Sequence, residues 1–168
     1  MPSPSPSPQT VEPRSRDADR SQLAILAAAK EEFSRHGLAG ARVDRIAENA
    51  KLNKRLIYYY FTSKDDLFLA VLEGAYADIR IAEQQLHLTE LTPAQAIRRL
   101  TEFTWNYYLE HPEFLTLLNS ENLHQAKHLK RSQRIQQMNS PLIQTLGEIL
   151  ERGRTEGIFR GGIDPVQL

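Results

Sequence analysis

Apolar residues recur every three to four positions along most of the chain, and this spacing constrains the fold more than any other feature. The longest run covers about residues 64–86, with apolar residues at Leu67, Phe68, Val71, Leu72, Ala75, Ile79, Ala82 and Leu86. Such a pattern forms one apolar stripe along an α-helix. No stretch shows the sustained alternation of a half-buried strand. The sequence therefore predicts an all-α protein.

Capping and terminating residues place the other helices. A first helix is expected from about residue 20 to Gly37, because glycine readily takes the left-handed conformation that ends helices. Asn53 suits a helix N-cap, and Ser63 with Asp66 has the form of a capping box. Further helices are expected at about 43–50, 54–60, 64–86, 93–110, 112–129 and 141–155.

The two short helices at 43–50 and 54–60 form a helix-turn-helix motif. At about 100° per residue, Ile57 and Phe61 share the inner face of the second helix, whereas Arg55 and Tyr59 point away from it. Its three consecutive tyrosines therefore cannot all be buried. Exposed phenols suit DNA, because the ring packs on sugars and bases while the hydroxyl donates to a phosphate. The alternative is that Tyr58 and Tyr60 pack against the helix at 64–86.

The net charge of zero hides an asymmetry between the two parts of the chain. Residues 1–64 contain 11 basic and 7 acidic side chains, whereas residues 65–168 contain 10 and 14. The basic residues gather at Arg42, Arg45, Lys51, Lys54, Arg55 and Lys64. Such a patch attracts a polyanion. The alternative is a solvated helix face.

Composition excludes several classes of protein. The chain has no cysteine, which excludes disulfides and thiolate chemistry. No apolar run is long enough to span a membrane, and residues 1–16 lack the apolar centre of a secretory signal. We therefore expect a cytoplasmic protein in which residues 1–16 are a disordered tail. No phosphate-binding loop or nucleophile motif is present, so we predict no enzymatic activity and no cofactor.

One cluster of metal-ligating residue types needs interpretation. Glu121, His124 and His128 are spaced closely enough on one helix to suggest a metal site. The favoured interpretation is a polar face near a turn, so we predict no metal.

These motifs together resemble the DNA-binding domain of TetR/AcrR-family transcriptional regulators. The residues that carry the resemblance are Phe33, Gly37, Ile46–Ala47, Ile57–Phe61 and Ser63–Lys64. The resemblance implies a three-helix head at residues 17–63, joined through the long helix to a helical effector-binding and dimerisation domain at 64–168. It implies a DNA-binding transcriptional regulator, commonly a ligand-responsive repressor that binds a palindromic operator as a homodimer. The alternative function is a helical small-molecule-binding or adaptor protein without specific DNA recognition.

The resemblance also implies which residues contact double-stranded DNA. These are Arg42, Asn53, Lys54, Arg55, Leu56, Tyr58, Tyr59, Tyr60 and Lys64. Lys54, Arg55 and Leu56 approach base edges, the tyrosines touch phosphates and sometimes bases, and Lys64 holds a phosphate.

The sequence departs from the family pattern at three positions. Arg42 replaces a threonine that caps a helix, and Lys51 replaces a turn glycine, which strains the turn if that position needs positive φ. Leu56 replaces a polar base reader, so we expect an apolar contact there, for example with a thymine methyl group.

The resemblance implies a pocket for a small-molecule effector in the larger part of the chain. Its candidate lining is Phe103, Trp105, Asn106, Tyr107, Phe114, Asn119 and His124, and the same aromatic stripe contains Tyr108. Mostly apolar walls with a few polar groups suit such a site, and the alternative for this aromatic stripe is ordinary core.

Family members dimerise through their last two helices, and the end of this chain bears on that expectation. Asp164–Pro165 has the form of a helix start, yet the sequence ends at Leu168. We expect an incomplete C-terminal domain and a 168-residue form that associates weakly or is monomeric and binds DNA poorly.

Overall fold

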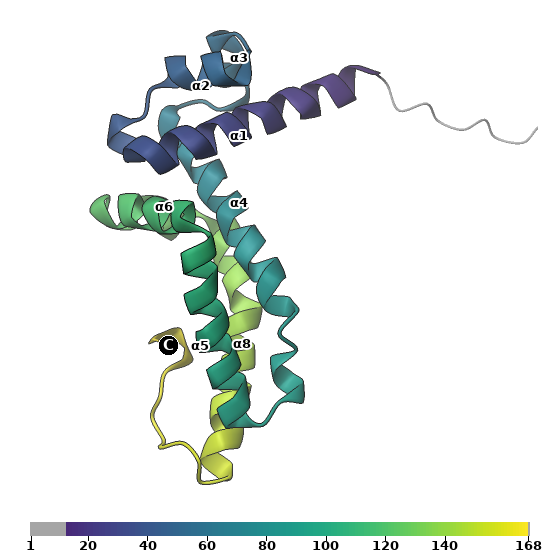
Figure 1. Ribbon diagram of the computed structural model, residues 1–168, viewed down its shortest axis with the longest axis vertical. Helices are drawn as coiled ribbons and strands as arrows, with labels where there is room; N and C mark the ends of the chain where they lie inside the picture. Colours follow the sequence, from purple (N-terminus) through teal and green to yellow (C-terminus); the bar gives the residue numbers. More distant parts are fainter. Residues whose placement is uncertain (1–12, 168) are drawn as a thin grey trace, which may run out of the picture.

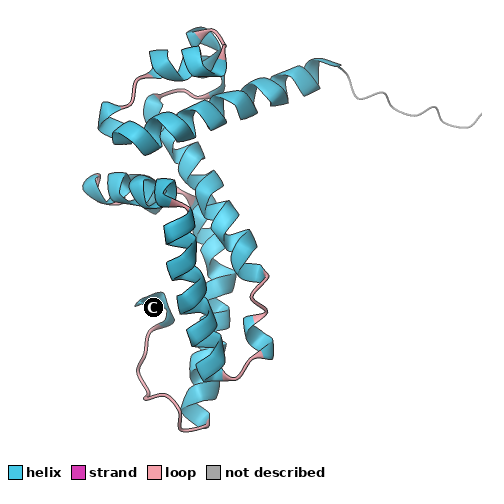
Figure 2. Ribbon diagram, viewed as in Figure 1, coloured by secondary structure: helices cyan, strands magenta, loops and turns pink. Residues whose placement is uncertain are grey.

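The computed structural model describes the backbone of residues 13–167 and the side chains of residues 17–167. All regular elements in this part of the chain are helical, which confirms the predicted class (Figure 1; Figure 2). They are α1 (Pro13–Gly40), α2 (Val43–Ala50), α3 (Lys54–Tyr60), α4 (Lys64–Gln84), η1 (Leu88–Glu90), α5 (Pro93–Glu110), α6 (Pro112–Leu123), α7 (Lys127–Arg131), α8 (Gln133–Thr155) and η2 (Pro165–Gln167).

The helices form a small head mounted on a longer bundle. α1 lies across one end of the molecule, and α2 and α3 pack on its outer side (Figure 1). α4 leaves this head and runs beside α5 and α8, while α6 crosses under α1. One hydrophobic core joins Phe33 and Ile46 of the head to Leu117 of α6 and Ile135 of α8. The head and the bundle therefore share a core.

Three predicted helix signals are confirmed. Asn53 Oδ1 accepts the Arg55 N–H at 2.8 Å, and Ser63 Oγ accepts the Asp66 N–H at 3.0 Å. Gly37 has φ of 62° at the kink that separates the last turn of α1 from the rest of the helix. Local sequence thus fixes these helix ends.

The start of α1 corrects the predicted tail. The helix begins at Pro13, so residues 13–16 are helical rather than part of a disordered segment. Proline suits the first helical position, because the N–H that it lacks has no partner there in any case. Residues 1–12 of the predicted tail lie outside the described residues.

The predicted helix at 112–129 is wrong in its second part. The chain turns at Gln125 and Ala126, which both have positive φ, and α7 then begins. The buried carboxylate of Glu121 accepts the N–H groups of His128 at 2.6 Å and Leu129 at 2.9 Å, so a tertiary contact caps α7. No glycine or proline marks this break.

The predicted start of the last long helix is also wrong. α8 begins at Gln133, where Ser132 Oγ accepts the Ile135 N–H at 3.1 Å, and Pro141 lies inside the helix. Proline removes the hydrogen bond to the carbonyl of Gln137. Both Pro141 and Gln137 are exposed, so solvent can satisfy that carbonyl.

None of the helices in the described part of the chain combines the length and apolarity that a membrane crossing requires.

Candidate nucleic-acid interface and effector cavity

The two faces of α3 are arranged as predicted. Ile57 and Phe61 are buried against the head, whereas Tyr59 is 79% exposed and Tyr58 is 47% exposed. Arg55 is exposed on the same outer surface. The segment therefore presents phenolic and cationic groups to solvent while its aliphatic and phenyl groups hold it in place.

Tyr60 is the least exposed of the three tyrosines. Its hydroxyl donates to the carbonyl of Ala18 at 3.2 Å, which ties α3 to α1. For Tyr60 this contact favours the packing alternative, although with α1 as the partner instead of α4. A DNA contact by Tyr60 stays a prediction.

Lys64 is held by the end of α1. Its Nζ donates to the carbonyls of Leu38 at 2.8 Å and Ala41 at 3.2 Å. The N–H of the same Leu38 donates to Ser120 Oγ of α6 at 2.9 Å. An ammonium has three N–H groups, so one remains for another acceptor. The predicted phosphate contact of Lys64 is untested.

Two more cations of the predicted patch already have partners. Lys54 Nζ lies 2.7 Å from Asp44 Oδ1, and this hydrogen bond raises the pKa of the Lys54 ammonium. Arg45 pairs with Glu32. Among the described side chains, Arg42, Lys51, Arg55 and Lys64 of the patch form no ion pair, so their positive charge is uncompensated by a carboxylate.

Glu32 organises the start of α2 from within α1. Its carboxylate, 3% exposed, accepts the backbone N–H of Arg42 at 2.9 Å and Nε of Arg45 at 2.8 Å. Burial on its own raises the pKa of Glu32, but the hydrogen bonds from Arg45 and Arg42 outweigh it and lower the pKa below its ordinary value. Arg42 has no capping side chain of its own, so Glu32 takes over part of the role expected of a cap.

The turn between α2 and α3 places Lys51 in the left-handed conformation, which residues other than glycine rarely adopt. Lys51 has φ of 55° and ψ of 38°, and its N–H closes the end of α2. This confirms the expected demand for positive φ at a position without glycine.

A cavity of about 220 Å³, which we call the inner cavity, lies between α4, α5, α6 and α8. Its walls include Tyr76, Ile79, Tyr108, Phe114, Leu118 and Leu146. The ring of Phe114 lies 5.7 Å from that of Tyr76 and 6.0 Å from that of Tyr108, between ring centroids. Aromatic and aliphatic walls with a few hydroxyl groups suit a small organic ligand.

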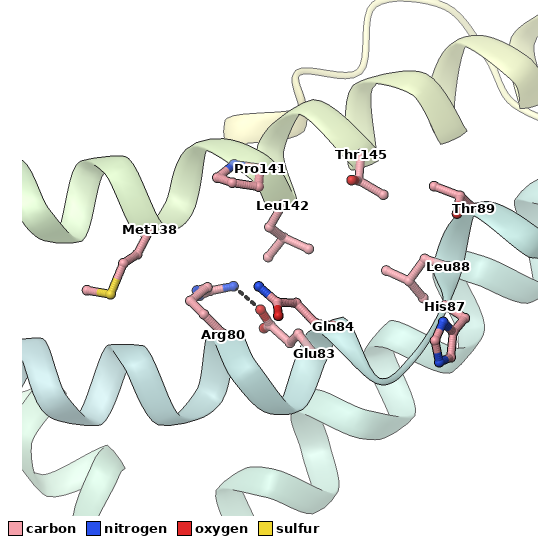
Figure 3. A pocket seen from close by; sticks show the side chains of 10 residues that line it. All are labelled: Arg80, Glu83, Gln84, His87, Leu88, Thr89, Met138, Pro141, Leu142 and Thr145. Carbon is pink, nitrogen blue, oxygen red and sulfur yellow. Dashed lines mark hydrogen bonds and ion pairs between the residues drawn. The ribbon is translucent and has the colours of Figure 1, made fainter. Parts of the chain in front are cut away.

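An ion pair lines part of the inner cavity. Arg80 and Glu83 are paired on α4, with side chains only 18% and 7% exposed. With Leu142, they also border an outer groove of about 250 Å³ between α4, η1 and α8, where Leu142 points from α8 toward the pair (Figure 3). Burial raises the pKa of the Glu83 carboxyl, and Arg80 offsets this only in part.

Only some of the predicted pocket residues line a cavity or groove. Phe114 lines the inner cavity, and Trp105 borders a separate groove of α5 and α8 together with Leu146. The remaining candidates lie outside the inner cavity: Phe103, Asn106, Tyr107, Asn119 and His124. Tyr107 packs on His111 instead, with ring centroids 4.2 Å apart, and His124 Nδ1 lies 2.7 Å from the carbonyl of Ser120.

Tyr108, from the aromatic stripe of the sequence, does line the inner cavity, whereas Tyr76, Arg80 and Glu83 were missed. A signal was present, since Leu72, Tyr76, Arg80 and Glu83 follow one another at the spacing of a single helix face. Two charged residues on the apolar side of a helix are unusual enough to mark a buried polar site.

The cluster considered for a metal forms a different arrangement. Glu121 Oε2 lies 2.6 Å from Nδ1 of His128, and both side chains are almost fully buried. Within residues 17–167, no three His, Asp or Glu side chains are grouped in a way that would hold a metal ion. The pair joins α6 to α7 next to Phe68 of α4.

A helix-turn-helix head with an exposed phenolic and cationic helix, carried on a helix that also walls a cavity, defines a helical DNA-binding regulator. The sequence family described as "Bacterial regulatory proteins, tetR family" matches residues 25–71, and "Tetracyclin repressor-like, C-terminal domain" matches residues 93–168. The HTH-type transcriptional repressor NicS of Pseudomonas putida is 45% identical over 150 residues, which span 89% of this chain and 71% of NicS. The chain belongs to the TetR family of transcriptional regulators.

Two further comparisons agree with this assignment. The HTH-type transcriptional repressor SCO4008 of Streptomyces coelicolor is 40% identical over 108 residues, 64% of this chain and 53% of SCO4008. The crystal structure of the putative transcriptional regulator SCO4942 from the same species superposes with a TM-score of 0.62 at 31% identity. That match covers 88% of this chain and 72% of SCO4942.

Proposed function

We propose that this DNA-binding regulator is a ligand-responsive repressor that binds a palindromic operator as a homodimer. The observation that carries the proposal is the outer face of α3, where Arg55 and Tyr59 are exposed while Ile57 and Phe61 anchor the helix. The repressors NicS and SCO4008 among its relatives support the mode of action. The proposal gives the protein no catalytic role and places it in the cytoplasm, with its operator DNA.

In this proposal residues 17–63 form the head that enters the major groove. Arg55 and Leu56 read base edges, and Arg42, Tyr58 and Tyr59 contact phosphates. Lys54 must release Asp44 to reach a base. Asn53 caps α3 with its oxygen, and its amide N–H groups have no acceptor among the described residues. Tyr60 and Lys64 act mainly by positioning the head, with a phosphate as a further acceptor for each.

The proposed effector site is the inner cavity within residues 64–168. α4 and α6 line this cavity, and both also contact the head through Leu38, which Lys64 and Ser120 hold from two sides. A ligand that displaces α6 or α4 therefore moves the end of α1. Because the two heads of a dimer must match two half-sites, such a movement changes operator affinity.

Selection of bound sites from random DNA, with the protein encoded by the whole gene, tests DNA recognition. We expect one palindromic sequence to emerge, and we expect Tyr59→Ala to weaken its binding by about tenfold or more. Trp105→Ala is the matched control, because Trp105 is a similarly exposed aromatic residue on α5, away from the head. Failure to enrich any sequence would instead support the alternative of a helical binding or adaptor protein.

A further inference from the structure

Arg80 keeps an unused edge of its guanidinium beside the inner cavity. Its one hydrogen bond to a described residue runs from Nη1 to Glu83. Nε is buried and has no hydrogen-bond partner among the described residues. A buried N–H without an acceptor is unfavourable, so this edge is suited to an acceptor from a ligand.

The geometry of the free edge favours one kind of acceptor. Nη1 lies on the side of Cδ, so Nε and Nη2 form the edge whose N–H bonds run parallel. Two parallel N–H groups match the two oxygens of a carboxylate, and such paired hydrogen bonds are stronger and more directional than a single one. A cationic group is disfavoured here, because arginine stays charged in proteins.

The other walls of the inner cavity indicate which chemical group of the ligand bears the carboxylate. Tyr76, Tyr108 and Phe114 supply aromatic walls. A cavity of roughly 150 Å³ accommodates a benzene ring, and the inner cavity of about 220 Å³ adds room for a small substituent. This volume suits a single ring.

We propose that the effector is a small aromatic carboxylate whose ring lies among Tyr76, Tyr108 and Phe114 and whose carboxylate takes the Nε edge of Arg80. This inference rests on the proposed effector site. Glu83 is the internal competitor for Arg80. Its buried carboxyl already has a raised pKa, so it can take up a proton when a second carboxylate arrives. The other titratable groups around the two cavities are Tyr76, Tyr108 and His87.

Calorimetric titration with three probes of one shape tests the ligand class. Benzoate is expected to bind about tenfold or more tightly than neutral benzamide, and cationic benzylamine is expected not to bind. This comparison uses the unaltered protein, so it does not depend on whether a variant folds. Equal affinity for benzamide, or no binding of benzoate at millimolar concentration, would overturn the proposal.

Substitutions at the ion pair then test the role of Arg80. Arg80→Lys keeps the charge but loses the parallel N–H groups, and we expect it to weaken benzoate binding by about tenfold or more. Arg98→Lys, on the exposed face of α5, is the matched control and should leave affinity unchanged. Glu83→Gln removes the competitor and should tighten benzoate binding. Weaker binding in Glu83→Gln, or an equal loss in Arg98→Lys, contradicts the assignment.

Operator binding is measured separately, so the two proposals can fail independently. Benzoate binding without any effect on operator DNA would leave the ligand class standing and reject the ligand-responsive function. Operator binding without any benzoate preference would reject the ligand class and leave DNA recognition standing.

Discussion

At the scale of single residues, what a cation already contacts determines what else it can bind. Arg55 and Lys64 are both basic residues of the predicted DNA surface. Arg55 is free of ion pairs among the described side chains, whereas Lys64 is bound to two carbonyls at the end of α1. Two basic side chains of the predicted surface therefore differ: Lys64 positions the end of α1, whereas Arg55 is available for the recognition role that we propose for it.

Lys64→Met should lower the free energy of unfolding of the DNA-free protein. The carbonyls of Leu38 and Ala41 lose a charged donor, and the expected cost is about 1–3 kcal/mol. Chemical denaturation measures it. Arg55→Met is the control and should change stability by less than about 0.5 kcal/mol, because the Arg55 side chain is exposed. Equal stability of the two variants would show that the lysine contacts contribute nothing to the fold.

Glu32→Gln should destabilise the head at neutral pH and reduce the acid sensitivity of the protein. The pKa of Glu32 is lowered in the folded state, so its charge stabilises the fold above the ordinary value of 4.5. This contribution is lost as pH falls through the lowered pKa. We expect a loss of about 2–4 kcal/mol at pH 7 that shrinks toward acidic pH, measured by denaturation at several pH values.

The neighbouring Glu31 supplies the control for this experiment. Its side chain is 52% exposed, and among the described side chains it pairs only with Arg35 one turn away. Glu31→Gln should therefore change stability by less than about 0.5 kcal/mol at either pH. A pH dependence as steep in Glu32→Gln as in the unaltered protein would mean that other carboxylates govern acid stability.

At the scale of helices, the local caps of α3 and α4 were predictable, whereas the break before α7 was not. Asn53 and Ser63 cap the helices that follow them through local hydrogen bonds. The break before α7 instead depends on Glu121, seven residues before His128 and buried by the fold. A helix end that a tertiary contact stabilises leaves no local signal.

Lys51→Gly should stabilise the turn between α2 and α3. Lys51 has positive φ, which carries a steric cost that glycine avoids, so we expect a gain of about 1 kcal/mol. Lys51→Ala removes the same charge but keeps Cβ, and it should give no gain. A higher melting temperature for Lys51→Gly alone would confirm that positive φ strains Lys51. Equal gains in both variants would show that removal of the Lys51 charge is the cause.

At the scale of the whole molecule, the head and the bundle share one continuous core. Phe33 and Phe68 pack edge to face at 5.1 Å, and the same cluster extends to Leu117 of α6. The hydrogen bond from Leu38 to Ser120 joins the two parts again at the end of α1. The parts are thus expected to fold as one cooperative unit rather than as independent domains.

Leu117→Ala should lower the stability of the head and the bundle together. Leu117 is fully buried, so the expected cost is about 2–5 kcal/mol. Fluorescence of Trp105 reports on the bundle and far-ultraviolet circular dichroism on all helices. The two should give coincident unfolding curves in the variant and in the unaltered protein. Separate transitions would show that the head unfolds on its own.

Much of the head could be predicted because its information is local. The positions of Ile57, Phe61, Arg55 and Tyr59 follow from helix geometry alone, and their burial agrees. The candidate effector site could not be predicted in the same way. Its lining comes from four helices, and only their packing shows that Phe114 lines the inner cavity whereas Asn119 does not.

The sequence by itself determined the all-α class, the helix-turn-helix and which side of α3 faces outward. Apolar spacing, caps and glycine act over one or two helical turns, so neighbouring residues are sufficient to define them. Only the tertiary structure decided that Lys64 holds the end of α1, that Glu121 caps α7, and that Nε of Arg80, beside a cavity, has no acceptor among the described residues. These features depend on how the helices pack, because burial determines which side chains meet and local patterns do not encode it.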